Sequence, residues 1–160
     1  MSWSEKKTLK NNFKWIPKHE RLDKIGLPVP PRPVDNRIPK LWITSLPPVE
    51  KALKTGNALV TDTYLVNSSG VMLESVIATT GGLQYWDEDD DECIYGTDQE
   101  IEYENVANGD AVRIFEHEAQ YDADWFLAIS LKVKMNDKWI KLNTSITKGT
   151  KGFLEEVLLY

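Results

Sequence analysis

Cysteine and long apolar runs are scarce in this sequence. Cys93 is the only cysteine among 160 residues, so the chain can form no internal disulfide, which suits a reducing compartment. The longest apolar pattern, over residues 125–135, contains Ser130, Lys132 and Lys134, and no window approaches the roughly 20 apolar residues of a membrane span. The N-terminal residues are polar and hold no apolar run of the kind found in secretory signals. We therefore expect a cytoplasmic protein without membrane contact.

Histidine is also scarce, and the common catalytic motifs are missing. His19 and His117 are the only histidines, which is too few for most zinc sites. The sequence contains no Walker loop, no dinucleotide-binding glycine fingerprint, no Cys-x-x-Cys pair and no nucleophile elbow. These absences predict a protein that is not an enzyme and uses neither a metal nor a cofactor.

Positive charge is nearly missing from the middle of the chain. The net charge of −6 combines +6 over residues 1–40, −15 over residues 41–130 and +3 over residues 131–160. Such an asymmetry indicates a partner that is recognised through charge. The acidic middle would repel DNA, so we expect no nucleic-acid partner. The alternative is that the acidic segments only keep the protein soluble.

The length fits one domain preceded by an arm. Residues 1–40 are predicted to form a basic, Pro-rich N-terminal arm packed on the domain, and residues 41–160 a single β-rich domain. The prolines between residues 27 and 39 favour an extended strap. Short helices are predicted over residues 17–26 and 47–55, each bounded by proline and glycine. From Thr150 the chain forms either a closing helix or a last edge strand.

Alternation of apolar and polar residues predicts about six strands. It is clearest over residues 125–135, where every second residue is apolar and two lysines lie on the other face. Weaker strand patterns cover residues 58–66, 71–79, 100–106, 112–118 and 139–146. Residues 58–66 and 71–79 are predicted to form a hairpin around residues 67–70. The predicted fold is mainly β (α+β): an antiparallel sheet in hairpin order, as a sandwich or half-barrel with short peripheral helices.

An acidic run with two aromatic neighbours is the first candidate site. The predicted partner-binding residues here are Tyr85, Trp86, Asp87, Glu88, Asp89, Asp90, Asp91 and Glu92. Adjacent carboxylates favour a solvated loop that captures a basic partner, with the aromatic residues as anchors. A purely solubilising loop is an equal alternative. Asp87, Asp89 and Asp91 match the start of an EF-hand loop, but Glu92 occupies the position of the glycine, so no metal site is predicted.

Three glutamates on one predicted strand form the second candidate site. Glu100, Glu102 and Glu104 alternate with Ile101 and Tyr103, which places the carboxylates on one face and the apolar side chains on the other. A face of this kind lies either in water or on a cationic partner. We predict that it joins the acidic run in one acidic surface.

A histidine between two glutamates forms the third candidate. Glu116, His117 and Glu118, followed by Asp122 and Asp124, could supply general acid–base chemistry. On a strand the two glutamates share a face and the histidine lies on the other, so the three cannot converge locally. A polar strand end is therefore the preferred interpretation.

The acidic surface, the aromatic anchors and the lack of catalytic motifs together predict a binding protein. We expect an acidic intracellular protein that neutralises a basic protein partner. In this character the chain resembles bacterial immunity proteins that silence nuclease toxins, which implies a cognate toxin domain as the partner. A nuclease displays a basic cleft for phosphate, and a carboxylate surface with aromatic anchors can occupy it. The alternatives are a small hydrolase or isomerase that uses His117 and the nearby carboxylates, and a phage or plasmid protein whose surface imitates DNA.

Overall fold

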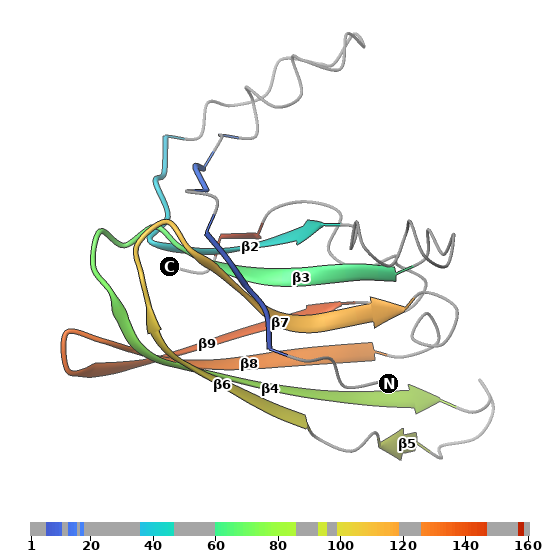
Figure 1. The fold of residues 1–160 in the computed structure, drawn as a ribbon. Coiled ribbons are helices and arrows are strands. Elements are labelled where there is room, and N and C mark those ends of the chain that lie inside the picture. Colours follow the sequence, from blue (N-terminus) through green and yellow to red (C-terminus); the bar gives the residue numbers. More distant parts are fainter. Residues whose placement is uncertain are drawn as a thin grey trace, which may run out of the picture.

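Two antiparallel sheets make up the computed structural model, which describes residues 6–10, 13–15, 17, 36–46, 60–85, 93–95, 99–118, 126–146 and 157–158. The sheets lie one above the other as two layers (Figure 1). The first has the strand order β1-β7-β3-β2-β10, with the bounds β1 Thr8–Leu9, β7 Ala111–Glu118, β3 Val60–Asn67, β2 Leu41–Leu46 and β10 Val157–Leu158. The second has the order β5-β4-β8-β9, with β6 also on β4, and the bounds β5 Cys93–Tyr95, β4 Leu73–Tyr85, β8 Phe126–Met135, β9 Lys138–Ile146 and β6 Gln99–Val106.

The main hydrophobic core lies between the two sheets. Strand β8 shows how the sequence produces it, because its alternate residues Ile129, Leu131, Val133 and Met135 are buried while Lys132 is exposed. Period-two alternation on a strand puts successive side chains on opposite faces, so one face of β8 enters the core. The predicted alternation is thus confirmed wherever the structure describes the side chains. Strands β2, β3, β4, β6 and β7 supply the remaining core residues in the same way.

The turn between β8 and β9 is a two-residue hairpin turn. Lys138 pairs with Met135, and the two residues between them, Asn136 and Asp137, both have positive φ angles, of 51° and 60°. Asn and Asp tolerate this backbone region better than most residues, and such turns match the twist of the flanking strands.

The predicted hairpin of residues 58–66 and 71–79 is wrong, because its two strands belong to different sheets. Strands β2 and β7 occupy both edges of β3, so β4 finds no free edge there and pairs with β5, β6 and β8. The chain crosses between the layers after Asn67. The buried Asn67 side chain holds this crossing, since its Nδ2 donates to the carbonyl oxygens of Val71, at 2.8 Å, and Val106, at 3.0 Å. The turn at residues 107–110 likewise joins β6 in one sheet to β7 in the other.

The N-terminal arm packs on the outer face of the first sheet. Leu9, Phe13 and Trp15 cover a second apolar cluster there, which consists of Trp42, Tyr64, Val66 and Ala111. The Trp15 ring meets Trp42 edge-on, with the ring centroids 5.2 Å apart. Strand β1 extends this sheet at β7, with antiparallel pairing of Leu9 and Ala111. No strand was predicted within residues 1–40, and Thr8 and Leu9 add one to the first sheet.

No helix is found among the described residues. The predicted helix at residues 47–55 and nearly all of the one at 17–26 lie outside them, as does most of the proline-rich strap. Near the C-terminus the alternative of an edge strand holds for Val157 and Leu158, which form β10 on the edge of β2. None of the described segments is a long apolar helix of the kind that crosses a membrane.

Candidate functional site

Strand β6 presents a row of three exposed carboxylates. Glu100, Glu102 and Glu104 are exposed, while Ile101 and Tyr103 between them are buried in the core. The sequence pattern predicts this arrangement because the strand has one face on the core and one in water. We call Glu100, Glu102 and Glu104 the acidic row.

The acidic row stands at one side of the second sheet. Among the described strands β6 pairs only with β4, so no described strand pairs with its other edge. Two hydroxyl groups of β4 donate long hydrogen bonds to the row, from Ser75 Oγ to Glu102, at 3.4 Å, and from Thr79 Oγ1 to Glu100, at 3.5 Å. These contacts orient carboxylates that remain largely in water.

The acidic run of residues 87–92 lies outside the described residues, but its neighbours in sequence are anchored beside β6. Tyr85, the last residue of β4, pairs with Cys93, the first residue of β5. Strands β5 and β6 pair with the same β4, β5 at residues 83–85 and β6 at residues 73–80. Strand β5, which follows the acidic run in the sequence, and strand β6, which carries the acidic row, therefore pair with neighbouring parts of β4.

The outer face of the second sheet is not uniformly acidic. Ile77 of β4 pairs with Glu102 on one side and with Lys132 of β8 on the other, and Lys132 in turn pairs with Lys141 of β9. Lys134 follows on the same strand as Lys132 and forms an ion pair with Glu74, at 3.0 Å. The face thus carries carboxylates on β6 and ammonium groups on β8 and β9, with a nearly neutral strand between them.

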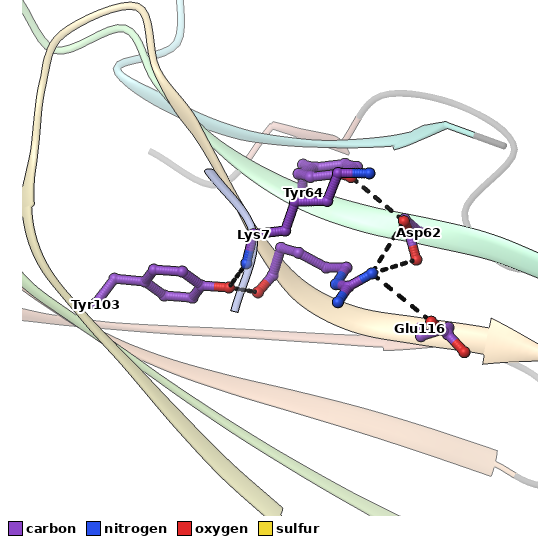
Figure 2. Close-up of polar contacts among 6 residues, drawn as sticks. Lys7, Asp62, Tyr64, Tyr103 and Glu116 are labelled. Atoms are coloured by element: carbon purple, nitrogen blue, oxygen red, sulfur yellow. Dashed lines mark hydrogen bonds and ion pairs between the residues drawn. The ribbon is translucent and has the colours of Figure 1, made fainter. Parts of the chain in front are cut away.

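A second polar group of the molecule is buried on the outer side of the first sheet (Figure 2). Asp62 is fully buried, and Arg113 and Glu116 are 9% and 6% exposed. The Arg113 Nη1 atom lies 3.3 Å from Asp62 Oδ2 and 3.7 Å from Glu116 Oε2, so one guanidinium serves two carboxylates. Tyr64 donates its hydroxyl hydrogen to Asp62, at 3.3 Å.

Burial is the largest influence on the pKa values of Asp62 and Tyr64. It raises the pKa of Asp62 above the ordinary 3.8; the Arg113 guanidinium opposes the rise, and the Glu116 carboxylate adds to it. Burial and the neighbouring Asp62 carboxylate also raise the pKa of Tyr64. The cluster therefore holds its charges at a cost in solvation, which the ion pairs offset in part.

Tyr103 connects the two layers next to this cluster. Its hydroxyl donates to the carbonyl oxygen of Arg113, at 2.6 Å, and accepts from the backbone N–H of Lys7, at 3.0 Å. The Lys6 ammonium lies 5.9 Å from the centre of its ring. A core residue of β6 thereby fastens β7 and the N-terminal arm to the second sheet.

The cluster of Asp62, Tyr64 and Arg113 was not predicted from the sequence. One signal was present: Arg113 is the only lysine or arginine between Lys54 and Lys132, and it lies in a strand pattern. A lone cation in an acidic, apolar stretch is a candidate for a buried ion pair.

The structure describes only part of the third candidate site. Glu116 belongs to the buried cluster, and the His117 backbone pairs with Thr61 of β3. The side chains of His117 and Glu118 lie outside the described residues, as do Asp122 and Asp124. Within the described part of the chain no group of three or more His, Cys, Asp or Glu side chains is arranged to hold a metal ion.

Comparison with protein-family models, with curated proteins and with solved structures finds no match to this chain.

Proposed function

We propose that the chain is an acidic binding protein that neutralises a basic protein partner, in the manner of an immunity protein acting on a nuclease-type toxin. The observation that carries the proposal is the acidic row of Glu100, Glu102 and Glu104, exposed on a strand that pairs with β4 alone among the described strands. Tyr85, Trp86 and the acidic run Asp87–Glu92 complete the proposed contact surface, and the anchoring of β5 and β6 along one strand supports including them.

The physical basis is electrostatic complementarity. A nuclease needs a basic cleft to hold phosphate, and a row of carboxylates can enter such a cleft in place of the nucleic-acid backbone. Carboxylates that are largely in water accelerate association and select the partner more than they deepen affinity. The binding is therefore expected to weaken as salt is added.

The lysines of β8 and β9 restrict how a basic partner can approach. Lys132 and Lys141 lie on the same sheet face as the acidic row and would repel a cationic surface that covered the whole face. The proposed contact is therefore the acidic row on β6 together with the β4–β5 connection, rather than the centre of the sheet.

A capture experiment tests the proposal. The tagged protein serves as bait in lysate of the source cells, washed at low and at high salt, beside a variant that carries Glu100→Lys, Glu102→Lys and Glu104→Lys. We expect one stoichiometric basic partner that is released by salt and lost with the variant. The nuclease activity of the eluted partner should fall when the unmodified protein is added back.

Lys132→Gln with Lys141→Gln is the matched control, because it changes charges on the same face without touching the acidic row. This control should retain the partner. An acidic row can also serve only to keep an edge strand from pairing with other chains. Retention of the partner by the charge-reversed variant, with unchanged salt dependence, would exclude the proposed interface, and the absence of any partner at low salt would exclude the function.

A further inference from the structure

A pocket of about 420 Å³ opens at the end of the sandwich where the chain crosses between the sheets. Phe13, Lys14 and Trp15 of the N-terminal arm form one part of its lining, and Ile38 precedes β2. Ser68 after β3 and Asn108 in the β6–β7 turn complete the polar part of the lining. The volume is within the range of small-molecule sites, which is about 300–1,000 Å³.

Hydrogen bonds hold the lining residues in place without a ligand. The Trp42 indole N–H donates to Ser68 Oγ, at 2.9 Å, and the Ser68 N–H donates to the Lys40 carbonyl oxygen, at 2.8 Å. The Phe13 N–H donates to the carbonyl oxygen of Gly109, at 3.1 Å. Four separate chain segments are thus fixed around one space, so a ligand would meet a largely formed site.

The polar side chains of the pocket offer hydrogen-bond donors. Ser68 Oγ accepts from Trp42, which leaves its hydroxyl hydrogen to donate. Asn108 Oδ1 accepts from the Gly70 N–H, at 2.9 Å, which assigns the amide and leaves its NH₂ group to donate. Lys14 adds an exposed ammonium group. No carboxylate is among the lining residues that the structure describes, and these residues therefore favour a ligand that accepts hydrogen bonds and carries negative charge.

The rest of the lining is apolar and partly aromatic. Phe13 and Trp15 are half-buried, and Ile38 is 86% exposed, the most exposed large hydrophobic side chain in the described part of the chain. Apolar surface left in water at the rim of a pocket is a feature of ligand sites. A flat apolar or aromatic body would cover it and pack against the two aromatic rings.

We propose that this pocket binds a small aromatic carboxylate, with the carboxylate among Lys14, Ser68 and Asn108 and the ring against Phe13, Trp15 and Ile38. The site lies on the N-terminal arm and the crossover turns and does not include the acidic row on β6. It therefore goes beyond the proposed function, and either one can fail without the other.

Titration of the full-length protein with indole-3-propionate, followed by amide NMR, tests the proposal. The probe combines an aromatic ring with a carboxylate, and indole-3-propionamide is its neutral counterpart. We expect saturable shifts at Phe13–Trp15, Ser68 and the Asn108 side-chain amide, and at least about fivefold weaker binding of the propionamide, because a charge-assisted hydrogen bond is stronger than a neutral one.

Two lysine variants separate the site from general charge effects. Lys14→Gln should weaken the binding of indole-3-propionate about fivefold and leave that of the propionamide unchanged. Lys10→Gln is the matched control, since Lys10 belongs to the same arm but pairs with Asp110, at 3.7 Å, outside the pocket. It should leave both affinities unchanged.

Three results would overturn the proposal. Absence of saturable shifts at the pocket up to the solubility limit of the probe would exclude the site. Equal affinity for the acid and the propionamide would exclude recognition of the carboxylate. Equal weakening by Lys10→Gln and Lys14→Gln would show a general charge effect rather than a contact in the pocket.

Discussion

Arg113 determines the electrostatics of the buried polar cluster. Its guanidinium lies within ion-pair distance of two carboxylates, those of Asp62 and Glu116, and all three residues are at least 90% buried. Removing one partner of a buried ion pair leaves an uncompensated charge and typically costs about 3–5 kcal/mol. Replacing the whole group with apolar residues often costs little. The cluster is therefore better evidence for a specific local arrangement than for a large gain in stability.

Asp62 makes the stability of the fold depend on pH in a definite direction. Its pKa is raised in the folded protein, so protonated Asp62 favours the fold; this contribution is complete below about pH 3.8 and is lost as pH rises through the folded pKa. We predict that the unfolding free energy of the unmodified protein falls relative to that of Asp62→Asn as pH rises from the acid side. Urea unfolding of both proteins across this range measures the difference. A difference that grows in favour of the unmodified protein would show that Arg113 outweighs the cost of burial.

At the scale of elements, a residue other than glycine that has a positive φ angle in a turn lowers the stability of the fold. Asp137 has a φ of 60° in the β8–β9 turn, and its side chain is 93% exposed, so its ion pair with Lys134 contributes little. We predict that Asp137→Gly raises the unfolding free energy by about 0.5–1 kcal/mol, because glycine adopts this conformation without strain and Asn-Gly is the preferred pair in such turns. Denaturant unfolding measures the change.

Gly70 tests the same effect in the opposite direction, because here a glycine with a positive φ angle is replaced instead of introduced. It has a φ of 82°, and an added Cβ atom would meet nothing within 4 Å. Gly70→Ala should therefore cost about 1–2 kcal/mol through backbone conformation alone. A gain in stability from Gly70→Ala, or a loss from Asp137→Gly, would contradict the conformational account.

The faces of single strands were predictable, whereas their partners were not. The burial of Ile101 and Tyr103 and the exposure of the acidic row follow from alternation within β6 alone. The pairing of β3 with β2 and β7, instead of with β4, depends on which edges are free once the sheets assemble. Turn residues signal that a chain reverses, but the same residues serve a hairpin and a crossing between layers.

At the scale of the whole molecule, the two sheets share one core and should unfold together. The main core cluster combines Leu65 and Ile114 of the first sheet with Val76 and Leu131 of the second. We predict that Leu131→Ala lowers the unfolding free energy by about 2–5 kcal/mol and lowers hydrogen-exchange protection equally in β3, β7, β4 and β8. The measurement is native-state hydrogen exchange.

Lys132→Ala is the matched control for this prediction, because Lys132 follows Leu131 on β8 but lies on the exposed face. It should change stability by no more than about 0.5 kcal/mol. Loss of protection in β4 and β8 with unchanged protection in β3 and β7 would show that the sheets are independent units.

The distribution of charge over the surface is also a property of the whole molecule. The sequence places the negative charge in the middle of the chain and most of the positive charge at its ends. The fold then brings Lys132 and Lys141, from the C-terminal part, onto the same sheet face as the acidic row. This sheet face is therefore acidic along β6 and basic along β8 and β9.

The sequence by itself determined six of the strands, β3, β4, β6, β7, β8 and β9, and the inner and outer faces of β6 and β8, because these depend on residues a few positions apart. Strands β1, β2 and β5 were not predicted. Tertiary structure alone decided which strands pair, where the chain crosses between sheets, and which distant side chains meet. Asp62 and Arg113 are 51 positions apart, and the pocket collects residues from four chain segments. Local patterns cannot specify such contacts, since they form only when both sheets bury their apolar faces against each other and leave particular polar groups enclosed.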